Sequence, residues 1–600
     1  MSMSVGTARP GMGALPHDQG VAFRVWALHA ERVFVTGTFN QWSPDAHPLT
    51  LEGEGVWFAD VPTAKINDEY RFLLYRGEQR LSRIDPYARE VTNSVGNSVV
   101  HDPRFDWEGD NFHLPPWNEL VIYEMHIGTF HDDPGGKPGT FAAAIEKLSH
   151  LKRLGVNAIE VMPIAEFAGD FSWGYNPAQI FAVESAYGGP RAFQQFVKDA
   201  HKAGFGVILD VVYNHFGPSD LSLWQFDGWS ENNLGGIYFY NDWKSETPWG
   251  NTRPDYGRSE VRQFIRDNAL MWLEDYHVDG LRFDMTLYIR TVRGEGQGAD
   301  LPDGWSLTQW INREVRERFP GRITIAEDLQ NNAWLTKEVK DGGAGFGAQW
   351  DAQFVHPIRA AVIAANDESR SLKAVGDAIA FNYNGDPFER VIYSESHDEV
   401  ANGKARVPSE VDPADPENFF AQKRSTLAAG LVFTTPGIPM LFQGQEFLQG
   451  GWFQDTVPVD WDLSEEFRGI LRMYRDLVRL RLNRQNTTRG LCGRGVNVHH
   501  ENQSQKLIAF HRWDARGPGD DVVVVANFAA ESRENYTLGF PAAGLWKLRL
   551  NSDWKGYSHE FDDYPSQDVT AASGPYDGYP CQAKIKIAPY SLLIYSQDKS

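Results

Sequence analysis

Apolar residues follow three successive patterns along the chain. From residue 20 to about residue 100, short apolar runs such as GVAFRVWA and ERVFVTGTF alternate with turn residues, which predicts β-strands. From about residue 119, apolar strands alternate with segments in which apolar residues recur every three or four positions, as on one face of a helix. After a predicted helix near residues 466–483, strand-like runs such as DVVVVANF and SLLIYS return.

The central pattern predicts a parallel barrel. LVIYEMH, VNAIEVMPI and FGVILDVVYNH are expected to be strands, and the helical segments between them end at Gly155 and Gly204. Strands that alternate with helices form a parallel sheet. So many units over about 350 residues predict an α/β fold, a (β/α)8 TIM barrel, in which the chemistry lies at the carboxyl ends of the strands.

Three domains are expected within the 600 residues. Residues 1–112 are predicted to form an N-terminal β-sandwich, residues 113–485 the catalytic barrel and residues 486–600 a C-terminal β-sandwich. A stretch rich in Trp, Tyr, Gly and Asn, about residues 216–256, interrupts the rhythm after the third strand. This stretch predicts an inserted loop subdomain above the mouth of the barrel.

Charge and composition narrow the range of partners. The chain carries 57 basic and 80 acidic residues, a net charge of −23, so no nucleic acid or membrane partner is expected. Twenty tryptophans suit sugar binding, because flat pyranose faces stack on aromatic rings. Two cysteines fit no disulfide framework, no signal peptide is visible, and no apolar run is long enough to span a membrane. A cytoplasmic protein is expected, as a monomer or small homo-oligomer.

Ionisable residues end four of the predicted strands. These residues are Asp210, Asn214 and His215 in ILDVVYNH, Arg282 and Asp284 in GLRFD, Glu327 and Asp328 in ITIAED, and His397 and Asp398 in VIYSESHD. A single carboxylate at a strand end could equally belong to a structural ion pair. Four such ends in succession, in a predicted barrel, favour one shared site.

Two of these strand ends suggest glycosidic chemistry. Arg282 and Asp284 are two positions apart, so their side chains share one face, and the guanidinium would hold the carboxylate ionised and oriented. A retaining glycosidase needs such a nucleophile and a second, initially protonated carboxyl about 5–5.5 Å away. Glu327 is the candidate acid, because dense like charge raises the pKa of one carboxyl. His397 and Asp398 could bond sugar hydroxyls.

The motifs in this order resemble a known family. DVVYNH, DGLRFD, TIAED and SHD are similar to the four signature regions of glycoside hydrolase family 13, the α-amylase family, and GVAFRVWA with TGTFNQW resembles carbohydrate-binding module family 48. The resemblance covers nearly the whole chain. It implies that Asp284 is the nucleophile, Glu327 the acid/base and Asp398 the stabiliser of the transition state. It also implies a set of substrate-binding residues: Tyr175, Asp210, His215, Arg282 and His397.

The motifs leave more than one reaction open within that family. YSESHDEVANGK and the helix before the fourth strand resemble 1,4-α-glucan branching enzymes, which transfer a cleaved chain to a 6-hydroxyl. DVVYNHFGP is more similar to hydrolases, namely α-amylases, isoamylases and maltooligosyltrehalose trehalohydrolases. GQEF replaces the usual form of branching enzymes, and AED also occurs in the trehalohydrolases. Branching is the leading hypothesis, and hydrolysis is the alternative. A non-catalytic glucan-binding protein is a remote alternative, because it would require the loss of a carboxylate and all three are present.

Ligand expectations follow from the same resemblance. The partner would be an α-glucan such as glycogen, starch, amylose or a maltooligosaccharide. No cofactor is expected, and the metal content is unknown. Asn214 matches a position that binds calcium in many α-amylases, although a bond from this side chain to the local backbone is an equal alternative.

Aromatic residues carry two further expectations. Of Trp26, Trp42 and Trp57, one or more should lie in the core of the N-terminal domain. In the inserted stretch, exposed aromatic side chains could hold an acceptor chain, and Trp229 is the first candidate. The aromatic residues of this stretch are Trp224, Phe226, Trp229, Tyr238, Phe239, Tyr240, Trp243 and Trp249.

Overall fold

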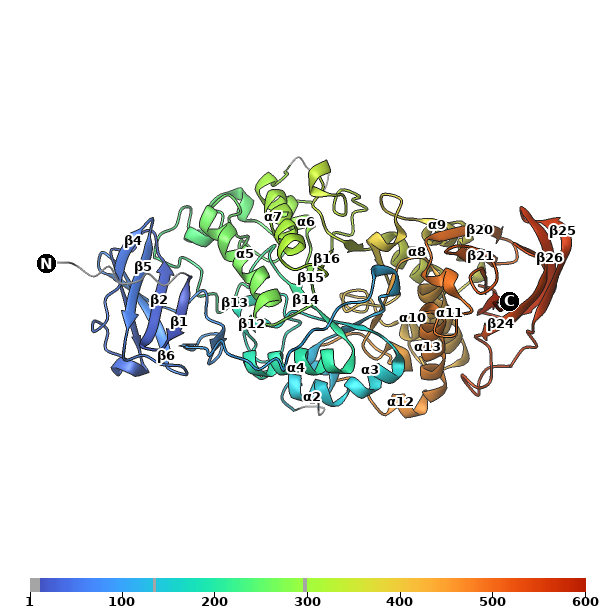
Figure 1. Cartoon of the computed structure of the whole chain (residues 1–600), viewed down its shortest axis with the longest axis horizontal. Helices are drawn as coiled ribbons and strands as arrows, with labels where there is room; N and C mark the ends of the chain where they lie inside the picture. Colours follow the sequence, from blue (N-terminus) through green and yellow to red (C-terminus); the bar gives the residue numbers. More distant parts are fainter. Residues whose placement is uncertain (1–10, 133–135, 295–298, 600) are drawn as a thin grey trace.

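Eight parallel strands close into a barrel in the part of the chain that a computed structural model describes, residues 11–132, 136–294 and 299–599 (Figure 1). Each strand pairs in parallel with the next, and the eighth pairs with the first. The barrel strands are β10 (Ile122–Met125), β11 (Ala158–Val161), β14 (Gly206–Val211), β15 (Gly280–Phe283), β16 (Ile323–Ala326), β17 (Ala348–Trp350), β18 (Arg390–Ile392) and β19 (Ile438–Phe442). The predicted barrel is confirmed.

Alternate residues of each strand face the two sides of the barrel wall. Ile122 and Ile208 belong to one buried cluster, which contains residues from most of the barrel strands. Tyr123 and Leu209 belong to another buried cluster, which also contains the helix residue Phe196. Both faces of the wall are therefore buried, which is why these strands are nearly continuous apolar runs in the sequence.

Helices surround the barrel and fill most of the connections between its strands (Figure 1). Gly155 and Gly204 end two of them with φ of 99° and 97°, a left-handed conformation that favours glycine. The helices are α1 (Ile127–Phe130), α2 (Phe141–Glu146), α3 (Leu148–Leu154), α4 (Gly189–Ala203), α5 (Ser259–Glu274), α6 (Leu287–Arg290), α7 (Pro302–Arg318), α8 (Ala352–Ile363), α9 (Leu372–Ala380), α10 (Val407–Val411), α11 (Phe419–Thr434), α12 (Leu463–Glu466) and α13 (Arg468–Arg481).

The N-terminal region is the predicted β-sandwich. One sheet has the strand order β1-β2-β5-β4, and the other has the order β3-β6-β9-β8 with β7 paired to β6. Val25 and Phe72, one from each sheet, are completely or almost completely buried in the shared core. The strands are β1 (Gly13–His17), β2 (Gly20–Trp26), β3 (Arg32–Gly37), β4 (Thr50–Gly53), β5 (Val56–Val61), β6 (Glu69–Arg76), β7 (Gln79–Arg83), β8 (Glu90–Val91) and β9 (Ser98–Val99).

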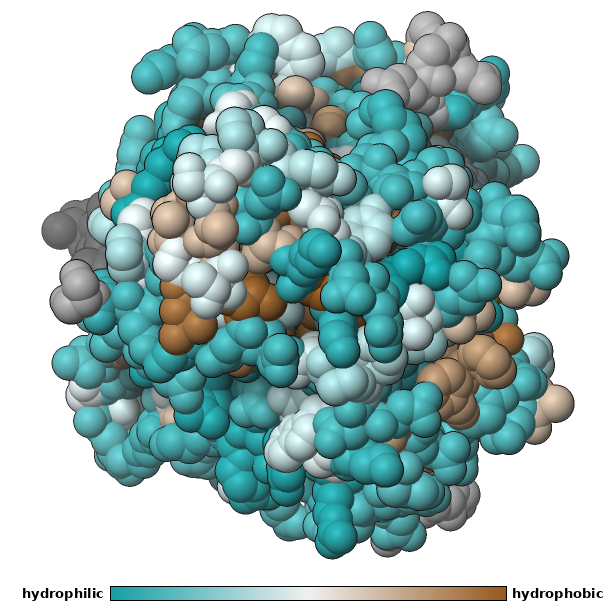
Figure 2. All heavy atoms as spheres, turned by 90° about the vertical axis from the view of Figure 1, so that its right-hand side faces the viewer, coloured by the Kyte–Doolittle hydropathy of each residue, from teal (hydrophilic) through white to brown (hydrophobic). Residues whose placement is uncertain are grey.

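The C-terminal region is also all-β, as predicted. Its strands form one sheet in the order β20-β21-β22-β27-β24-β25-β26-β23, with its own buried cluster around Leu507, Val525 and Trp546. The surface at this end of the molecule is mostly hydrophilic (Figure 2). The strands are β20 (Gly495–Asn502), β21 (Leu507–Trp513), β22 (Val522–Asn527), β23 (Arg533–Phe540), β24 (Gly544–Asn551), β25 (Val569–Tyr576), β26 (Tyr579–Ile587) and β27 (Ser591–Ser596).

Two long loops rise from the carboxyl ends of the early barrel strands. The loop after β11 carries the hairpin of β12 (Ala165–Phe167) and β13 (Pro177–Val183). The loop after β14 is the inserted stretch, and it contains short 3-10 turns but no α-helix or β-strand within the described residues 216–256. None of the helices in the described ranges is both long and apolar enough to cross a bilayer.

The N-terminal sandwich docks on the inserted stretch. The His29 main-chain N–H donates to Asp227 Oδ2 at 2.8 Å, and the His29 ring lies 2.9 Å from the same oxygen. Asp227 is completely buried, and the Trp26 ring meets Tyr238 edge-on at 5.2 Å. The Trp229 ring stacks on His29 at 4.6 Å. Both Trp26 and Trp57 are buried, which confirms the prediction for the domain core.

Removal of residues 1–100 is therefore expected to produce insoluble protein, because it exposes Tyr238 and removes the His29 N–H that donates to the buried Asp227, while the Trp229 N–H remains. The measurement is the soluble fraction after expression. Asp227→Ala in the full chain should lower the free energy of unfolding by about 1–3 kcal/mol, whereas Trp42→Ala, at an exposed position of the same domain, should change it by less than about 0.5 kcal/mol. A soluble and fully active truncation would contradict this role of the N-terminal domain.

Candidate active site

Arg282 is at the centre of the candidate site. Its side chain is fully buried on β15, and the strand register places it directly beside Asp210 of β14. The Arg282 Nη1 atom lies 2.5 Å from Asp210 Oδ2 and 3.2 Å from Asp284 Oδ1. The Nη2 atom lies 2.9 Å from Glu327 Oε2, as an ion pair that lacks the alignment of a hydrogen bond. One guanidinium thus contacts three carboxyl groups.

Asp284 is held from two sides. Arg282 contacts its Oδ1, and the Asn214 amide donates a hydrogen bond of 2.7 Å to its Oδ2. Asn214 also donates to the main-chain oxygen of Asp284 at 3.2 Å, so its amide bonds both the side chain and the backbone of this residue. In the described ranges, no group of three or more His, Cys, Asp and Glu side chains is arranged to hold a metal ion. Calcium binding at Asn214 stays a prediction.

Burial is the largest cause of the pKa shift of both Glu327 and Asp284. It raises the pKa of Glu327 to about 7, with Arg282 opposing this rise and the charges of Asp284 and Asp398 adding to it. Burial also raises the pKa of Asp284 to about 6, again against the effect of Arg282. The Met285 N–H donates to Glu327 Oε2 at 2.9 Å, which fixes the carboxyl's orientation. The higher of the two values belongs to Glu327, in the direction expected for an acid.

The remaining predicted residues close one side of the same site. Tyr175 donates a hydrogen bond of 2.6 Å from its hydroxyl to Asp210, and its ring stacks on His397 at 4.8 Å. His397 contacts Glu124 through its main-chain N–H and through Nδ1, at 3.1 and 2.5 Å. Burial alone would lower the pKa of His397, but the charge and hydrogen bond of Glu124 raise it above its ordinary value. Asp398 is partly exposed and accepts a hydrogen bond from Asn402.

His215 joins the site through an aromatic neighbour. It is fully buried, and burial lowers its pKa to about 3, which keeps the ring neutral. Its ring stacks on Trp249 at 4.4 Å, and 36% of the Trp249 surface stays exposed. Of the aromatic residues of the inserted stretch, Trp243 and Trp249 are the exposed ones. Trp229 is only partly exposed, because its ring packs between His29 and Arg258, and its role in holding an acceptor stays a prediction.

Sequence reasoning missed two acids and one aromatic residue of the site. Glu124 and Glu160 lie side by side in the register of β10 and β11, and both are buried. Burial raises the pKa of Glu160 well above its usual value, and its Oε2 has no hydrogen-bond partner. Trp350, on the short strand β17, lies with its ring centroid 4.2 Å from the Arg282 guanidinium carbon. The available signal was an acid in the middle of an apolar strand, in LVIYEMH and VNAIEVMPI.

The charged residues that follow the seventh strand support its conformation. Glu395 and Arg406 are both buried and pair at 3.3 Å, and the Val407 N–H donates to Glu395 at 2.6 Å. Hydrogen bonds with His356 at 3.0 Å and Lys404 at 2.9 Å lower the pKa of Glu399 to about 2 against the effect of burial. These ion pairs and hydrogen bonds order the segment that follows His397 and Asp398.

A barrel with buried carboxyls gathered around one arginine at the strand ends is the arrangement of an enzyme that acts on glycosidic bonds. The family models agree, because residues 122–221 and 221–479 match the α-amylase catalytic domain. The chain belongs to the α-amylase family. Residues 11–88 match carbohydrate-binding module 48, the isoamylase N-terminal domain, and residues 498–598 match the α-amylase C-terminal all-β domain.

Curated relatives extend over most of the chain. A 1,4-α-glucan branching enzyme of Xanthomonas euvesicatoria pv. vesicatoria is 32% identical, across 97% of this chain and 80% of the relative. The branching enzyme of Corynebacterium jeikeium is 31% identical, across 90% and 77%. That of Marinobacter nauticus is 30% identical, across 96% and 94%.

Solved structures share the fold. The pullulanase of Anoxybacillus sp. LM18-11 in complex with maltotetraose aligns with a TM-score of 0.73 at 22% identity, across 98% of this chain and 88% of that one. The type I pullulanase of Bacillus subtilis in complex with maltose aligns with a TM-score of 0.74 at 21% identity, across 99% and 86%.

Glu124 and Glu160 provide a matched pair of substitutions. Glu124→Gln is expected to lower the pKa of His397, because it removes the carboxylate that favours the charged imidazole, and to lower the free energy of unfolding by about 1–3 kcal/mol. Glu160→Gln should change the free energy of unfolding by less than about 1 kcal/mol, because burial already favours the neutral acid that an amide resembles. Titration of the His397 ring by NMR and denaturant unfolding measure the two effects. If both variants changed the His397 pKa and the free energy of unfolding equally, Glu124 would not be the group that raises the pKa of His397.

Proposed function

We propose that this chain is a 1,4-α-glucan branching enzyme, which cleaves an α-1,4 bond and transfers the freed chain to a glucan 6-hydroxyl. The observation that carries the retaining chemistry is the contact of Arg282 with both Asp284 and Glu327 in one buried site. The transfer step is supported by the branching enzymes among the relatives, at 30–32% identity across 90–97% of this chain. The substrate would be glycogen, starch, amylose or a long maltooligosaccharide.

In the first step, the Asp284 carboxylate would attack the anomeric carbon while Glu327 gives its proton to the leaving oxygen. Arg282 and Asn214 hold the two oxygens of Asp284, so the nucleophile is oriented before the substrate arrives. Glu327 can start protonated near neutral pH because burial raises its pKa to about 7. The glycosidic bond breaks, and a covalent glycosyl ester forms on Asp284.

In the second step, Glu327 would act as a base. It takes the proton of an acceptor 6-hydroxyl, whose oxygen attacks the anomeric carbon and releases the Asp284 carboxylate. His397 and Asp398 would bond the hydroxyls of the sugar in the −1 subsite, and Tyr175 would stack on its ring. Tyr175 and His397 already stack on each other, so the ring and the imidazole have a fixed orientation.

A hydrolase of the α-amylase or maltooligosyltrehalose trehalohydrolase type is the second candidate. DVVYNHFGP favours it, GQEF departs from the usual form of branching enzymes, and the same residues would serve if water replaced the 6-hydroxyl. A non-catalytic glucan-binding role is disfavoured, because Asp284, Glu327 and Asp398 are all present.

Glu327 should control the alkaline limb of the pH profile. Activity should fall as pH rises through about 7, because the acid loses its proton. Glu327→Gln should slow α-glucosides with poor leaving groups by several orders of magnitude and activated fluorides much less. A raised folded-state pKa means that stability falls as pH rises from the unfolded value to about 7, so thermal unfolding of Glu327→Gln should depend less on pH over that interval.

Asp284→Asn is the control for this prediction. It should abolish the activity toward both kinds of substrate by several orders of magnitude, because the covalent step then has no nucleophile. A uniform loss in Glu327→Gln, with the alkaline limb unmoved, would contradict its role as the acid.

Product analysis on long amylose tests the transfer itself. The expected result is about one new α-1,6 linkage per cleavage with little new reducing sugar, because the acceptor is a glucan rather than water. NMR of the linkages and a reducing-end assay measure the two quantities. One reducing end per cleavage, with no α-1,6 linkages, would establish the hydrolase instead.

Trp249→Ala should then shift the ratio of transfer to hydrolysis toward hydrolysis, because an exposed ring that touches His215 is placed to hold an acceptor chain. Trp243→Ala is the matched control. It removes an exposed tryptophan of the same stretch whose ring lies beside Arg293, so the ratio should stay near that of the wild type.

A further inference from the structure

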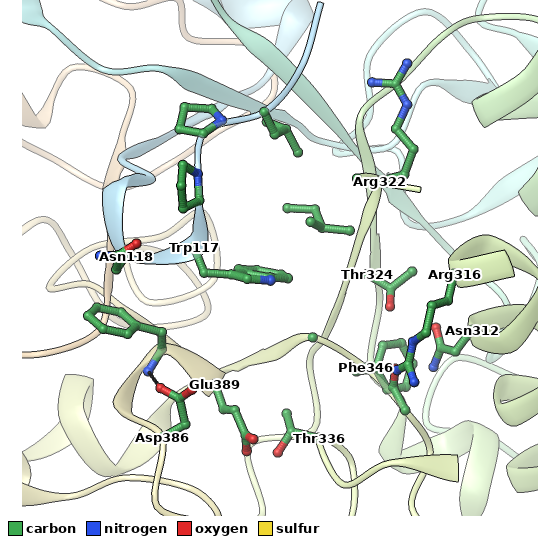
Figure 3. A pocket seen from close by; sticks show the side chains of 18 of the residues that line it. Trp117, Asn118, Asn312, Arg316, Arg322, Thr324, Thr336, Phe346, Asp386 and Glu389 are labelled. Carbon is green, nitrogen blue, oxygen red and sulfur yellow. Dashed lines mark hydrogen bonds between the residues drawn. The ribbon is translucent and has the colours of Figure 1, made fainter. Parts of the chain in front are cut away.

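A cavity lies at the amino ends of several barrel strands, away from the site around Arg282 at their carboxyl ends. Its volume is about 980 Å³, at the upper end of the range of small-molecule sites, about 300–1,000 Å³. Trp117 comes just before β10, Arg322 just before β16, Phe346 just before β17, and Thr324 lies near the beginning of β16 (Figure 3). Glu327 follows the other end of β16, so the strand separates this cavity from the site around Arg282.

The cavity exists because one helix of the repeating pattern is absent. Residues 327–347, all of which the structure describes, form no α-helix between β16 and β17, only a 3-10 turn at Val339–Asp341. Parts of this connection, including Thr336 and Phe346, line the cavity with residues of α7. The space that a helix would fill beside β16 is therefore open.

Trp117 is the central side chain of this cavity. Its indole projects from the segment before β10 into the middle of the space (Figure 3). A Cβ atom at Gly347 would lie 2.2 Å from the Trp117 ring, so glycine at this position is what allows the ring to lie against the backbone. The other residues of the wall surround the ring, which could serve as a platform for a stacked ligand.

The polar groups of the wall favour a neutral ligand over an anion. Arg316 pairs with Glu338, Arg322 with Asp279 and Arg494 with Asp386. Because each of these guanidinium groups already has a carboxylate partner, no unpaired positive charge remains to attract a phosphate.

Hydrogen-bonding capacity is nevertheless available. Asn312 is 3% exposed and lines the cavity, its amide donates to Ala344, and its Oδ1 has no hydrogen-bond partner. The Thr324 hydroxyl and the Glu389 carboxyl also lie in the wall (Figure 3). An aromatic ring among hydroxyl, amide and carboxyl groups and paired guanidinium groups is suited to a ligand with many hydroxyls.

We propose that this cavity is a second carbohydrate site, in which an α-1,4-glucan chain stacks on Trp117 and bonds Asn312 and Thr324. The choice of an α-glucan over another neutral sugar rests on the proposed function. Side chains fill the interior of the barrel, so a bound chain cannot pass through it to Asp284 and must run around the outside. Only a long glucan can then occupy both sites together, and the site increases the local concentration of polymer at the enzyme.

Fluorine NMR of the full chain labelled with 5-fluorotryptophan tests binding directly. Asp284→Asn prevents turnover, and Trp117→Phe and Trp249→Phe assign the two signals of interest. Titration with maltohexaose should move the Trp117 signal saturably, in addition to that of Trp249. A response of Trp249 without one of Trp117 would overturn the second site and leave the proposed function standing. If neither signal responds, both proposals are wrong.

Kinetics test the role of the site. Trp117→Ala should raise KM for long amylose by roughly 3- to 10-fold, because a stacking contact is lost, while kcat and the KM for maltohexaose stay unchanged. Thr324→Val, which keeps the shape of the side chain, should change KM in the same direction by a smaller factor. Trp554→Ala, at an exposed tryptophan of the C-terminal region, is the control and should change neither value. An equal change for long and short substrates in Trp117→Ala and Thr324→Val, or no change in either, would overturn the proposal.

Discussion

The active site depends on the buried guanidinium of Arg282. One positive charge faces Asp210, Asp284 and Glu327, so full ionisation would leave two uncompensated negative charges away from water. Two unit charges 4 Å apart interact by about 4 kcal/mol at an effective dielectric constant of about 20. A proton on one carboxyl relieves much of that repulsion. The cluster therefore requires an acid near neutral pH, and burial makes Glu327, with a pKa of about 7, the group that holds it.

The register of the barrel creates this cluster. Glu124 is opposite Glu160, Asp210 is opposite Arg282, and all four lie on the strand face that carries Ile122, Ala158 and Ile208 one step below. A layer of charge thus rests directly on a layer of apolar side chains. A slip of one residue between β14 and β15 would turn Arg282 away from Asp210, and the carboxyls would lose their shared cation. The apolar layer below is consequently as necessary to the chemistry as the carboxyls are.

The strand ends could be predicted from the sequence, because parallel strands bring their carboxyl ends to one rim whatever the rest of the fold does. Asp284, Glu327 and His397 were found in this way. Glu124 and Glu160 were missed, since a lone acid within a strand looks the same in a sequence whether it forms an ion pair or supports a site. β17 has only the three residues Ala348–Trp350 and left no periodic pattern. The N-terminal domain covers part of Trp229 through His29 and leaves Trp249 exposed, which composition cannot indicate.

The choice between transfer and hydrolysis lies outside the charge cluster. Water and a 6-hydroxyl would attack the same ester on Asp284 and lose their proton to the same Glu327, so the cluster favours neither. Selection must come from groups that hold an acceptor long enough to exceed the rate of attack by water. The inserted stretch supplies such a position at Trp249, which touches the buried His215 on one side and solvent on the other. A polymer retained by a second site would also favour transfer, since it raises the local concentration of 6-hydroxyls without altering the chemistry at Asp284.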